Sequence, residues 1–172
     1  TRLLDQATAA GVDWTAWTVL DPACGGGAFL APVAQRMMKH LSHLEPGALL
    51  DHLATVLRGF EVDPFAAWLS QVLLDATVMP LYRAAGRRLP PMIDVRNSLT
   101  REPGDTRYDL VIGNPPYGRV TLSPRTRQRY ARSLYGHANL YGLFTDLALR
   151  WTRPGGVISY VTPTSFLSGE YF

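Results

Sequence analysis

The residues best suited to chemistry form the tetrapeptide Asn114-Pro115-Pro116-Tyr117, which follows the apolar run Asp109-Leu110-Val111-Ile112-Gly113. The run predicts a buried strand, so the tetrapeptide should form a rigid turn at its end. Two consecutive prolines fix φ and supply no N–H, so the Asn114 side chain and nearby carbonyls can present acceptors in a fixed geometry, with the Tyr117 ring alongside. This arrangement suits a planar amide or amine. The alternative is a loop that merely follows a strand, because Asn-Pro turns are common.

Four polar residues, Asp21, Glu61, Asn97 and Asn114, fall at or just beyond the ends of successive expected strands. In an open parallel sheet the carboxyl ends of the strands form the edge where ligands bind. Glu61 in that position is the expected partner of two ribose hydroxyls. Each residue also has a purely structural interpretation: Asp21 can cap a turn before its proline, and Glu61 can be a solvated side chain.

A glycine turn, Gly25-Gly26-Gly27, follows the first expected strand and precedes a helix. Such a helix N-terminus can accept a carboxylate or phosphate, or the glycines can simply relieve crowding between strand and helix. The turn does not match G-x-G-x-x-G, the chain has no G-K-[ST], and Glu61 lies 34 residues beyond Gly27 rather than about 20 past the motif. The spacing therefore disfavours a dehydrogenase or an NTPase.

Short apolar runs alternate with helical patterns, which is typical of a doubly wound, mostly parallel sheet in the α/β class. The expected strands are Thr18–Asp21, Gly59–Val62, Met92–Arg96, Tyr108–Gly113 and Val157–Thr162. The expected helices are Ala28–Leu44, Ala48–Leu57, Pro64–Ala85 and Leu140–Thr152, the last of them stopped by Pro154-Gly155-Gly156. We expect Pro32 in a first helical turn, Asp63 as an N-cap, an irregular stretch from Gly118 to Ala138, and another element beginning within Thr164–Phe172.

Composition restricts the class of protein more than its function. The 172 residues are 47% hydrophobic without an apolar run of membrane-spanning length, which predicts one soluble domain and no membrane partner. Cys24 is the only cysteine, which excludes a disulfide framework or a cysteine-rich metal site and favours a cytoplasmic location. Of the 17 basic residues only Lys39 is a lysine, and arginine's forked donors are suited to phosphate.

Several motifs together resemble the catalytic domain of the S-adenosylmethionine-dependent adenine-N6 DNA methyltransferases of restriction-modification systems. The matching segments, in family order, are Val19–Gly25 with Gly27, Phe29 and Leu30, then Gly59–Pro64, Asp109–Gly118, Asn139–Phe144, Pro154–Ile158 and Val161–Pro163. The segments Asp-Pro-Ala-Cys and Asn-Leu-Tyr-Gly together narrow the resemblance to the methyltransferases that act on DNA adenine. It implies a truncated Rossmann-like sheet of about five strands in the order 3-2-1-4-5.

The resemblance implies S-adenosylmethionine as cofactor. Its methionine part would contact the turn that contains Asp21, Ala23, Cys24, Gly25 and Gly27. Glu61 would hold the ribose hydroxyls, and Val62 would lie against the cofactor's adenine. Similar proteins usually carry an aspartate after strand three to accept the adenine amino group; the best match here is the amide Asn97, with Asp94 a weaker candidate inside the strand.

The resemblance also gives roles to the tetrapeptide. The Asn114 side-chain oxygen and the Pro115 carbonyl would each take one N–H of an adenine amine, which steers the nitrogen lone pair toward the methyl group. Tyr117 would stack on the base, and Pro116 is the remaining member of the catalytic tetrapeptide. The adenine must first be flipped out of the duplex, at a cost of a few kcal/mol. No metal is required.

The segment after the tetrapeptide is basic, because no acidic residue lies between Asp109 and Asp146. Its arginines are Arg119, Arg125, Arg127, Arg129 and Arg132, with Tyr130 and Tyr135 interleaved. Such a patch could contact DNA phosphates, or it could be a solvated loop. The family pattern further implies that Asn139, Tyr141 and Phe144 help to wall the base pocket, although aromatic residues at this spacing also suit a core.

In the family, further segments precede the first strand and follow the last. We therefore expect residues 1–172 to be a catalytic domain that is incomplete at both ends, inactive by itself, with target-recognition and any nuclease domains elsewhere. Two alternatives remain open. The first is a methyltransferase for RNA guanine or protein glutamine, and the second is a non-catalytic interaction domain that retains the fold.

Overall fold

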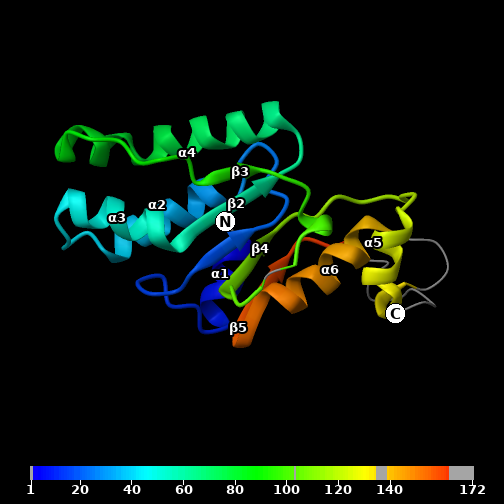
Figure 1. The fold of residues 1–172 in the computed structure, drawn as a ribbon. Helices are drawn as coiled ribbons and strands as arrows, with labels where there is room; N and C mark the ends of the chain where they lie inside the picture. Colours follow the sequence, from blue (N-terminus) through cyan, green and yellow to red (C-terminus); the bar gives the residue numbers. More distant parts are fainter. Residues whose placement is uncertain (1, 103, 135–138, 163–172) are drawn as a thin grey trace.

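In the computed structural model, which describes residues 2–102, 104–134 and 139–162, five strands form one parallel sheet flanked by helices (Figure 1). The strands are β1 (Val19–Asp21), β2 (Leu57–Glu61), β3 (Ile93–Val95), β4 (Tyr108–Gly113) and β5 (Thr152–Tyr160). The helices are α1 (Arg2–Ala9), α2 (Leu30–His40), α3 (Pro46–Val56), α4 (Pro64–Ala85), α5 (Pro124–Arg129) and α6 (Leu140–Trp151), with 3-10 turns η1 (Ser98–Thr100) and η2 (Ala131–Ser133). The predicted α/β class is confirmed.

The strand order is β3-β2-β1-β4-β5, which confirms the order 3-2-1-4-5. At the centre of the sheet, Val19 of β1 lies opposite Leu57 of β2 and Leu110 of β4. Because all these pairs are parallel, the carboxyl ends of the strands meet at one edge. Asp21, Glu61 and Gly113 are the last residues of three neighbouring strands and lie together there.

Both faces of the sheet are buried, as is usual for parallel strands. Alternate residues of β1 point to opposite faces: Val19 joins a core built with α1 to α4, and Leu20 joins a second core built with α6. In Figure 1, α2, α3 and α4 lie to one side of the sheet and α5 and α6 to the other. Each strand is thereby held rigidly, so the residues at its carboxyl end have fixed positions.

Helix α4 has the predicted boundaries. Asp63 caps it, since its side chain accepts a hydrogen bond from the Ala66 N–H at 2.7 Å, and Pro64 occupies the first helical position. The helix ends at Ala85 and is followed by Gly86, whose φ of 66° lies in the left-handed region. The Asp63 cap also fixes where β2 stops and therefore where Glu61 lies.

The other early boundaries differ from the predictions by a few residues. Helix α2 begins at Leu30 because Gly27, with φ 86°, continues the turn, and it ends at His40 because Leu41 to Leu44 form further turns. Pro32 is the third residue of the helix, within the first turn as predicted. Strand β2 begins two residues early, at Leu57, because it pairs with β1 from its first residue.

The prediction that Pro154-Gly155-Gly156 separates α6 from the last strand is wrong. Helix α6 ends at Trp151 and β5 begins at Thr152, so the three residues lie within the strand. The pairing register shifts between Tyr108, which pairs with Thr152, and Leu110, which pairs with Val157, so the extra residues of β5 form a bulge-like irregularity. A Cβ at Gly156 would lie 2.7 Å from the Asp109 carbonyl oxygen, so glycine permits this close approach.

The stretch from Gly118 to Ala138 is not wholly irregular. It contains α5, which begins after Ser123, whose side-chain oxygen accepts the Thr126 N–H at 3.2 Å, and it contains η2. The element expected within Thr164–Phe172 lies outside the described residues. Among residues 2–102, 104–134 and 139–162, no helix combines the length and apolar character needed to cross a membrane.

Candidate functional site

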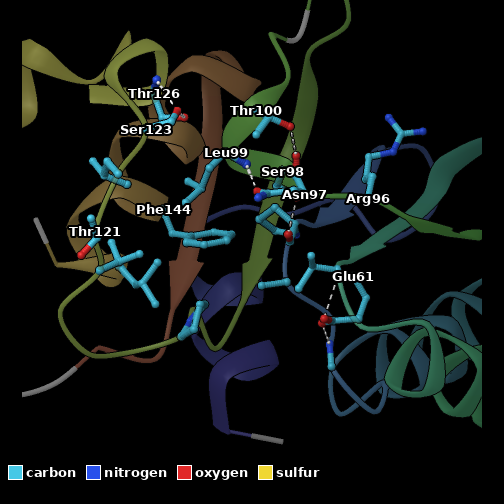
Figure 2. Close-up of a pocket in the computed structure, with 18 of the residues that line it drawn as sticks. Glu61, Arg96, Asn97, Ser98, Leu99, Thr100, Thr121, Ser123, Thr126 and Phe144 are labelled. Carbon is cyan, nitrogen blue, oxygen red and sulfur yellow. Dashed lines mark hydrogen bonds between the residues drawn. The ribbon is translucent and has the colours of Figure 1, made fainter. Parts of the chain in front are cut away.

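A cleft of about 690 Å³ opens at the carboxyl edge of the sheet, a size typical of small-molecule sites (Figure 2). One side consists of residues at or just beyond the ends of β1, β2 and β3: Pro22, Ala23, Gly25, Glu61, Val62, Arg96 and Asn97. The other side includes residues of the segment that follows β4 and of α6: Asn114, Pro116, Val120, Thr121, Leu122, Ser123, Thr126, Leu140 and Phe144. Ser98, Leu99 and Thr100 of η1 also line it. We call these sides the nucleoside half and the target half, after the ligands that the sequence analysis expects for Glu61 and for Asn114.

Glu61 is fixed in the nucleoside half by three backbone N–H groups. One carboxylate oxygen accepts the Gly25 N–H at 2.9 Å, and the other accepts those of Val62 at 2.8 Å and Asp63 at 2.9 Å. These bonds set the orientation of the carboxylate before a ligand arrives. Each oxygen has two lone pairs, so Oε2, which accepts only the Gly25 N–H, can accept a further hydrogen bond from a diol.

The glycine turn divides into residues that line the cleft and residues that pack beneath it. Ala23 and Gly25 line the cleft, whereas Cys24 is buried, with Sγ 3.6 Å from the Ser70 hydroxyl. A Cβ on Gly27 would lie 3.0 Å from the Ser70 Cα, so glycine lets α4 approach the turn. Burial raises the pKa of the Cys24 thiol to about 12, which keeps it protonated.

Asp21 does not line the cleft but lies beneath it, only 1% exposed. Its Oδ1 accepts the Ala23 N–H at 3.1 Å, and its Oδ2 has no hydrogen-bond partner among the described residues. Burial raises the pKa of this carboxyl to about 7. A Cβ on Gly113 would lie 2.6 Å from Oδ1, so the carboxyl also packs against the end of β4.

Asn97 lines the cleft and caps η1, because its Oδ1 accepts the Leu99 N–H at 3.0 Å. The Ser98 hydroxyl donates to the Pro22 carbonyl at 2.6 Å, which joins the loop after β3 to the turn after β1. Asp94 does not line the cleft and forms an ion pair with Arg96. Val62 is 63% exposed at the cleft and offers an apolar surface there.

Asn114 and Pro116 line the target half, and Pro115 between them is buried. The Tyr117 hydroxyl lies 2.5 Å from the Asn114 Oδ1 and 3.0 Å from the Val161 carbonyl oxygen. The hydroxyl has one proton, so it donates to one of these acceptors at a time. The acceptor predicted for an amine is therefore contacted in this structure by the protein's own phenol, and Tyr117 itself is 46% exposed.

Sequence reasoning missed most of the outer wall of the target half. Val120 and Leu122 are apolar, whereas Thr121, Ser123 and Thr126 add hydroxyls (Figure 2). The Ser123-Pro124 pair was an available signal, since serine followed by proline marks a helix start. It would have located α5 without showing that α5 borders the cleft.

The three residues predicted to wall the pocket, at the start of α6 and just before it, have different positions. Phe144 lines the cleft, whereas Tyr141 is buried and does not. Asn139 forms an isolated bridge with Arg119, and its buried Oδ1 has no hydrogen-bond partner among the described residues. Only Phe144 therefore reaches the cleft directly.

The basic segment is not a uniform patch. Arg119, Arg125, Arg127 and Arg132 are exposed, but Arg129 forms an ion pair with Glu102 at 2.6 Å and its side chain is only 15% exposed. Tyr130 is 1% exposed and belongs to the core, so its interpretation as a free aromatic of a nucleic-acid surface is wrong. Tyr135 lies outside the described residues. The part of the chain that the structure describes holds no cluster of three or more His, Cys, Asp or Glu side chains that could bind a metal ion.

The fold, with this strand order and a carboxylate fixed at the end of β2, is that of the S-adenosylmethionine-dependent methyltransferases. Among solved structures, the DNA-bound Type ISP restriction-modification enzyme LlaBIII superposes with a TM-score of 0.70 at 15% identity. The superposition covers 90% of this chain and 13% of that one. At such an identity the likeness concerns the fold.

Sequence comparison finds similarity to restriction-modification methylases. Residues 89–172 match the family of the Eco57I restriction-modification methylase. The Type II methyltransferase M.PaeR7I of Pseudomonas aeruginosa is 27% identical over 161 residues, which are 89% of this chain and 28% of that protein. M.TthHB8I of Thermus thermophilus is 32% identical over 164 residues, covering 87% and 30% respectively. The chain is a relative of the restriction-modification methyltransferases, which confirms the resemblance, and it spans less than a third of the length of these two relatives.

Proposed function

We propose that this chain is the catalytic domain of a DNA adenine-N6 methyltransferase that uses S-adenosylmethionine and serves a restriction-modification system. The observation that carries the proposal is that Glu61 and Asn114, from strands on either side of β1, border one cleft. One is suited to a ribose diol and the other to an amine. A cleft with both can bring a nucleoside cofactor and an amine substrate together.

The residues of the nucleoside half fit the cofactor. Glu61 would accept its ribose hydroxyls, Val62 would lie against its adenine, and Asn97 would accept the adenine amino group through the lone pair that Leu99 leaves free. Ala23 and Gly25 would lie beside its methionine part, with Asp21, Cys24 and Gly27 supporting the turn from below. Bound there, S-adenosylmethionine supplies an electrophilic methyl group.

The residues of the target half would hold the amine. Asn114 Oδ1 and the Pro115 carbonyl accept its two N–H groups, which directs the nitrogen lone pair away from both acceptors. The Tyr117 hydroxyl now contacts Asn114 Oδ1, so it must leave or share this oxygen when the amine binds. Its exposed ring is then available to stack on a base, while Pro116 and Phe144 close the cleft around it.

Duplex DNA is the proposed substrate, with its adenine flipped into the cleft. The exposed side chains of Arg119, Arg125 and Arg127 follow the Asn114 motif and supply positive charge for phosphates beside the flipped base. Residues 1–172 would form the catalytic part of a longer protein in which other segments read the DNA sequence. The cytoplasm is the proposed location.

Methyl transfer from labelled S-adenosylmethionine to duplex DNA tests the proposal in the full-length protein. Duplex DNA, RNA and protein extracts are offered as separate acceptors. We expect label in DNA alone. Label in RNA or protein would support the alternative enzyme class, and the absence of S-adenosylmethionine binding in calorimetry would favour a non-catalytic domain.

A further inference from the structure

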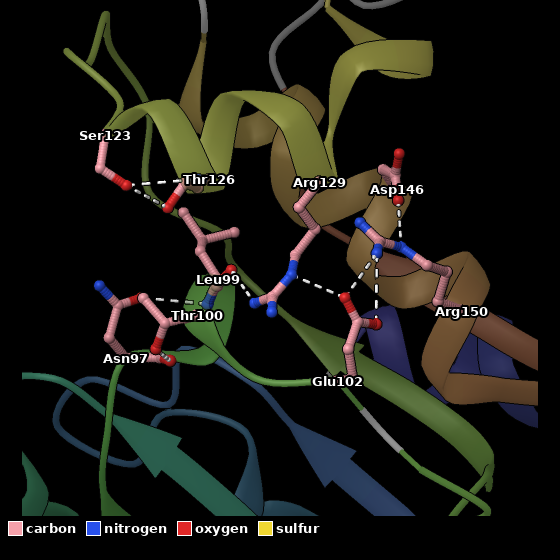
Figure 3. A network of polar contacts seen from close by, with 9 residues as sticks. All are labelled: Asn97, Leu99, Thr100, Glu102, Ser123, Thr126, Arg129, Asp146 and Arg150. Atoms are coloured by element: carbon pink, nitrogen blue, oxygen red, sulfur yellow. Dashed lines mark hydrogen bonds and ion pairs between the residues drawn. The ribbon is translucent and has the colours of Figure 1, made fainter.

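Arg129 is the one arginine of the basic segment, within its described part, that joins the two halves of the cleft. It is the last residue of α5, and its guanidinium reaches across to the loop after β3 (Figure 3). There Nη1 donates to the Leu99 carbonyl at 3.1 Å, and Nε forms an ion pair with Glu102 at 2.6 Å. A planar fork with several donors can make both contacts at once.

Leu99 connects Arg129 to Asn97 in the nucleoside half. Its carbonyl accepts from Arg129, and its N–H donates to the Asn97 side chain at 3.0 Å. Ser98, one residue earlier, holds the same turn to the Pro22 carbonyl. The turn that carries Asn97 is therefore fixed from two sides, by the β1 turn and by Arg129.

A network of alternating charges fixes Arg129 in turn. Glu102 also faces Arg150 at 3.4 Å, and Arg150 pairs with Asp146 of α6 at 2.5 Å (Figure 3). The Arg150 guanidinium lies 4.4 Å from the ring centroid of the buried Tyr130, directly after Arg129. The α5 segment is thus anchored at two adjacent residues, one by charge and one by burial.

We propose that Arg129 is a positioning residue that couples the outer wall of the target half to the cofactor-binding turn after β3. It holds Val120 to Thr126 against the cleft and at the same time keeps Leu99, and through it Asn97, in place. The inference rests on the proposed function, because it treats Asn97 as a cofactor contact. It assigns to Arg129 a role in cofactor affinity rather than a contact with DNA phosphate.

The test compares Arg129→Ala with Arg132→Ala, an exposed arginine of the same segment, in the full-length protein. Calorimetry gives the dissociation constant for S-adenosylmethionine, and thermal unfolding without cofactor gives stability. We expect Arg129→Ala to raise the dissociation constant about tenfold, as the loss of charged hydrogen bonds predicts, and Arg132→Ala to leave it unchanged. Arg129→Lys, which keeps the charge but not the fork, falls between the wild type and Arg129→Ala.

A merely structural role predicts a different pattern, in which Arg129→Ala lowers the unfolding temperature but the folded protein binds cofactor with the wild-type constant. That result overturns the proposal. Glu102→Gln, a milder change to the same contact, should raise the constant by a smaller factor, and it decides the matter if Arg129→Ala does not fold. If the wild-type protein itself binds no S-adenosylmethionine, the proposed function fails instead.

Discussion

The two halves of the cleft are held in different ways. In the nucleoside half, backbone N–H groups fix Glu61, and the glycine turn is packed against α4. In the target half, the stabilising contacts come from side chains: Tyr117 contacts Asn114, and Arg129 anchors α5. Backbone contacts follow from the fold itself, whereas side-chain contacts can be exchanged for a substrate. On the proposed function, Glu61 is already held in place before the cofactor binds, whereas the contact between Tyr117 and Asn114 must change when a base enters.

The largest expected effect separates binding from turnover. Asn114→Ala removes an acceptor from the target half alone, so we expect kcat for DNA methylation to fall by roughly 10²–10³-fold, with the cofactor dissociation constant changed less than about twofold. Single-turnover kinetics and calorimetry on the same preparation measure both. Retained turnover would contradict the role of Asn114, and lost cofactor affinity would contradict the separation of the two halves.

Glu61→Gln should instead weaken the binding of the cofactor. The amide replaces one acceptor oxygen with a donor, which cannot accept the N–H groups that fix the side chain, so the cofactor dissociation constant should rise by about 10²-fold. Glu45→Gln, at the exposed residue before α3 and outside the cleft lining, is the matched control and should change nothing. Equal cofactor binding by wild type and Glu61→Gln would show that the carboxylate does not hold the ribose.

Asp21 makes the support beneath the nucleoside half sensitive to pH. Burial raises its pKa from 3.8 to about 7, so folding favours the protonated form. The contribution of this group to stability is therefore fully present below pH 3.8 and is lost as pH rises through 7. We expect wild type to lose on the order of a few kcal/mol relative to Asp21→Asn between pH 4 and pH 8. Denaturant unfolding of both proteins without cofactor measures the free energy of unfolding at each pH. If this free energy changed with pH in the same way in both proteins, the prediction would be contradicted.

The smallest effect concerns the exposed arginines of the target half. Arg125→Ala and Arg127→Ala should each weaken DNA binding modestly and lower the slope of log K against log salt by about 0.9. Fluorescence anisotropy over a range of salt concentrations measures this slope. Arg129→Ala, whose side chain is engaged with Glu102, should leave the slope unchanged. A slope that responds to Arg129 and not to Arg125 or Arg127 would reverse the assignment.

The sequence located the strand ends that border the cleft better than the outer wall of the target half, for a physical reason. Glu61 and Asn114 could be placed because strand ends follow from local apolar runs, and parallel strands bring those ends to one edge. The wall from Val120 to Thr126 depends on Arg129 and Tyr130, whose partners lie far away in the sequence. The local periodicity of a sequence does not predict contacts of this kind.

The error at Pro154-Gly155-Gly156 has a similar origin. Proline and glycine usually end an element, so the sequence indicated a break between helix and strand. In the structure the strand continues through them because β4 pairs on both sides of a bulge, and Gly156 lets the Asp109 carbonyl approach. Long-range pairing overrides the local preference.

The identity of the methylated nucleoside tests the central claim most directly. After incubation of duplex DNA with S-adenosylmethionine and the full-length protein, the DNA is digested to nucleosides and analysed by mass spectrometry. We predict N6-methyladenine from the wild-type protein and none from Asn114→Ala. N4-methylcytosine, a ring-methylated base, or equal N6-methyladenine from both proteins would contradict the assignment of the target half to an adenine amine.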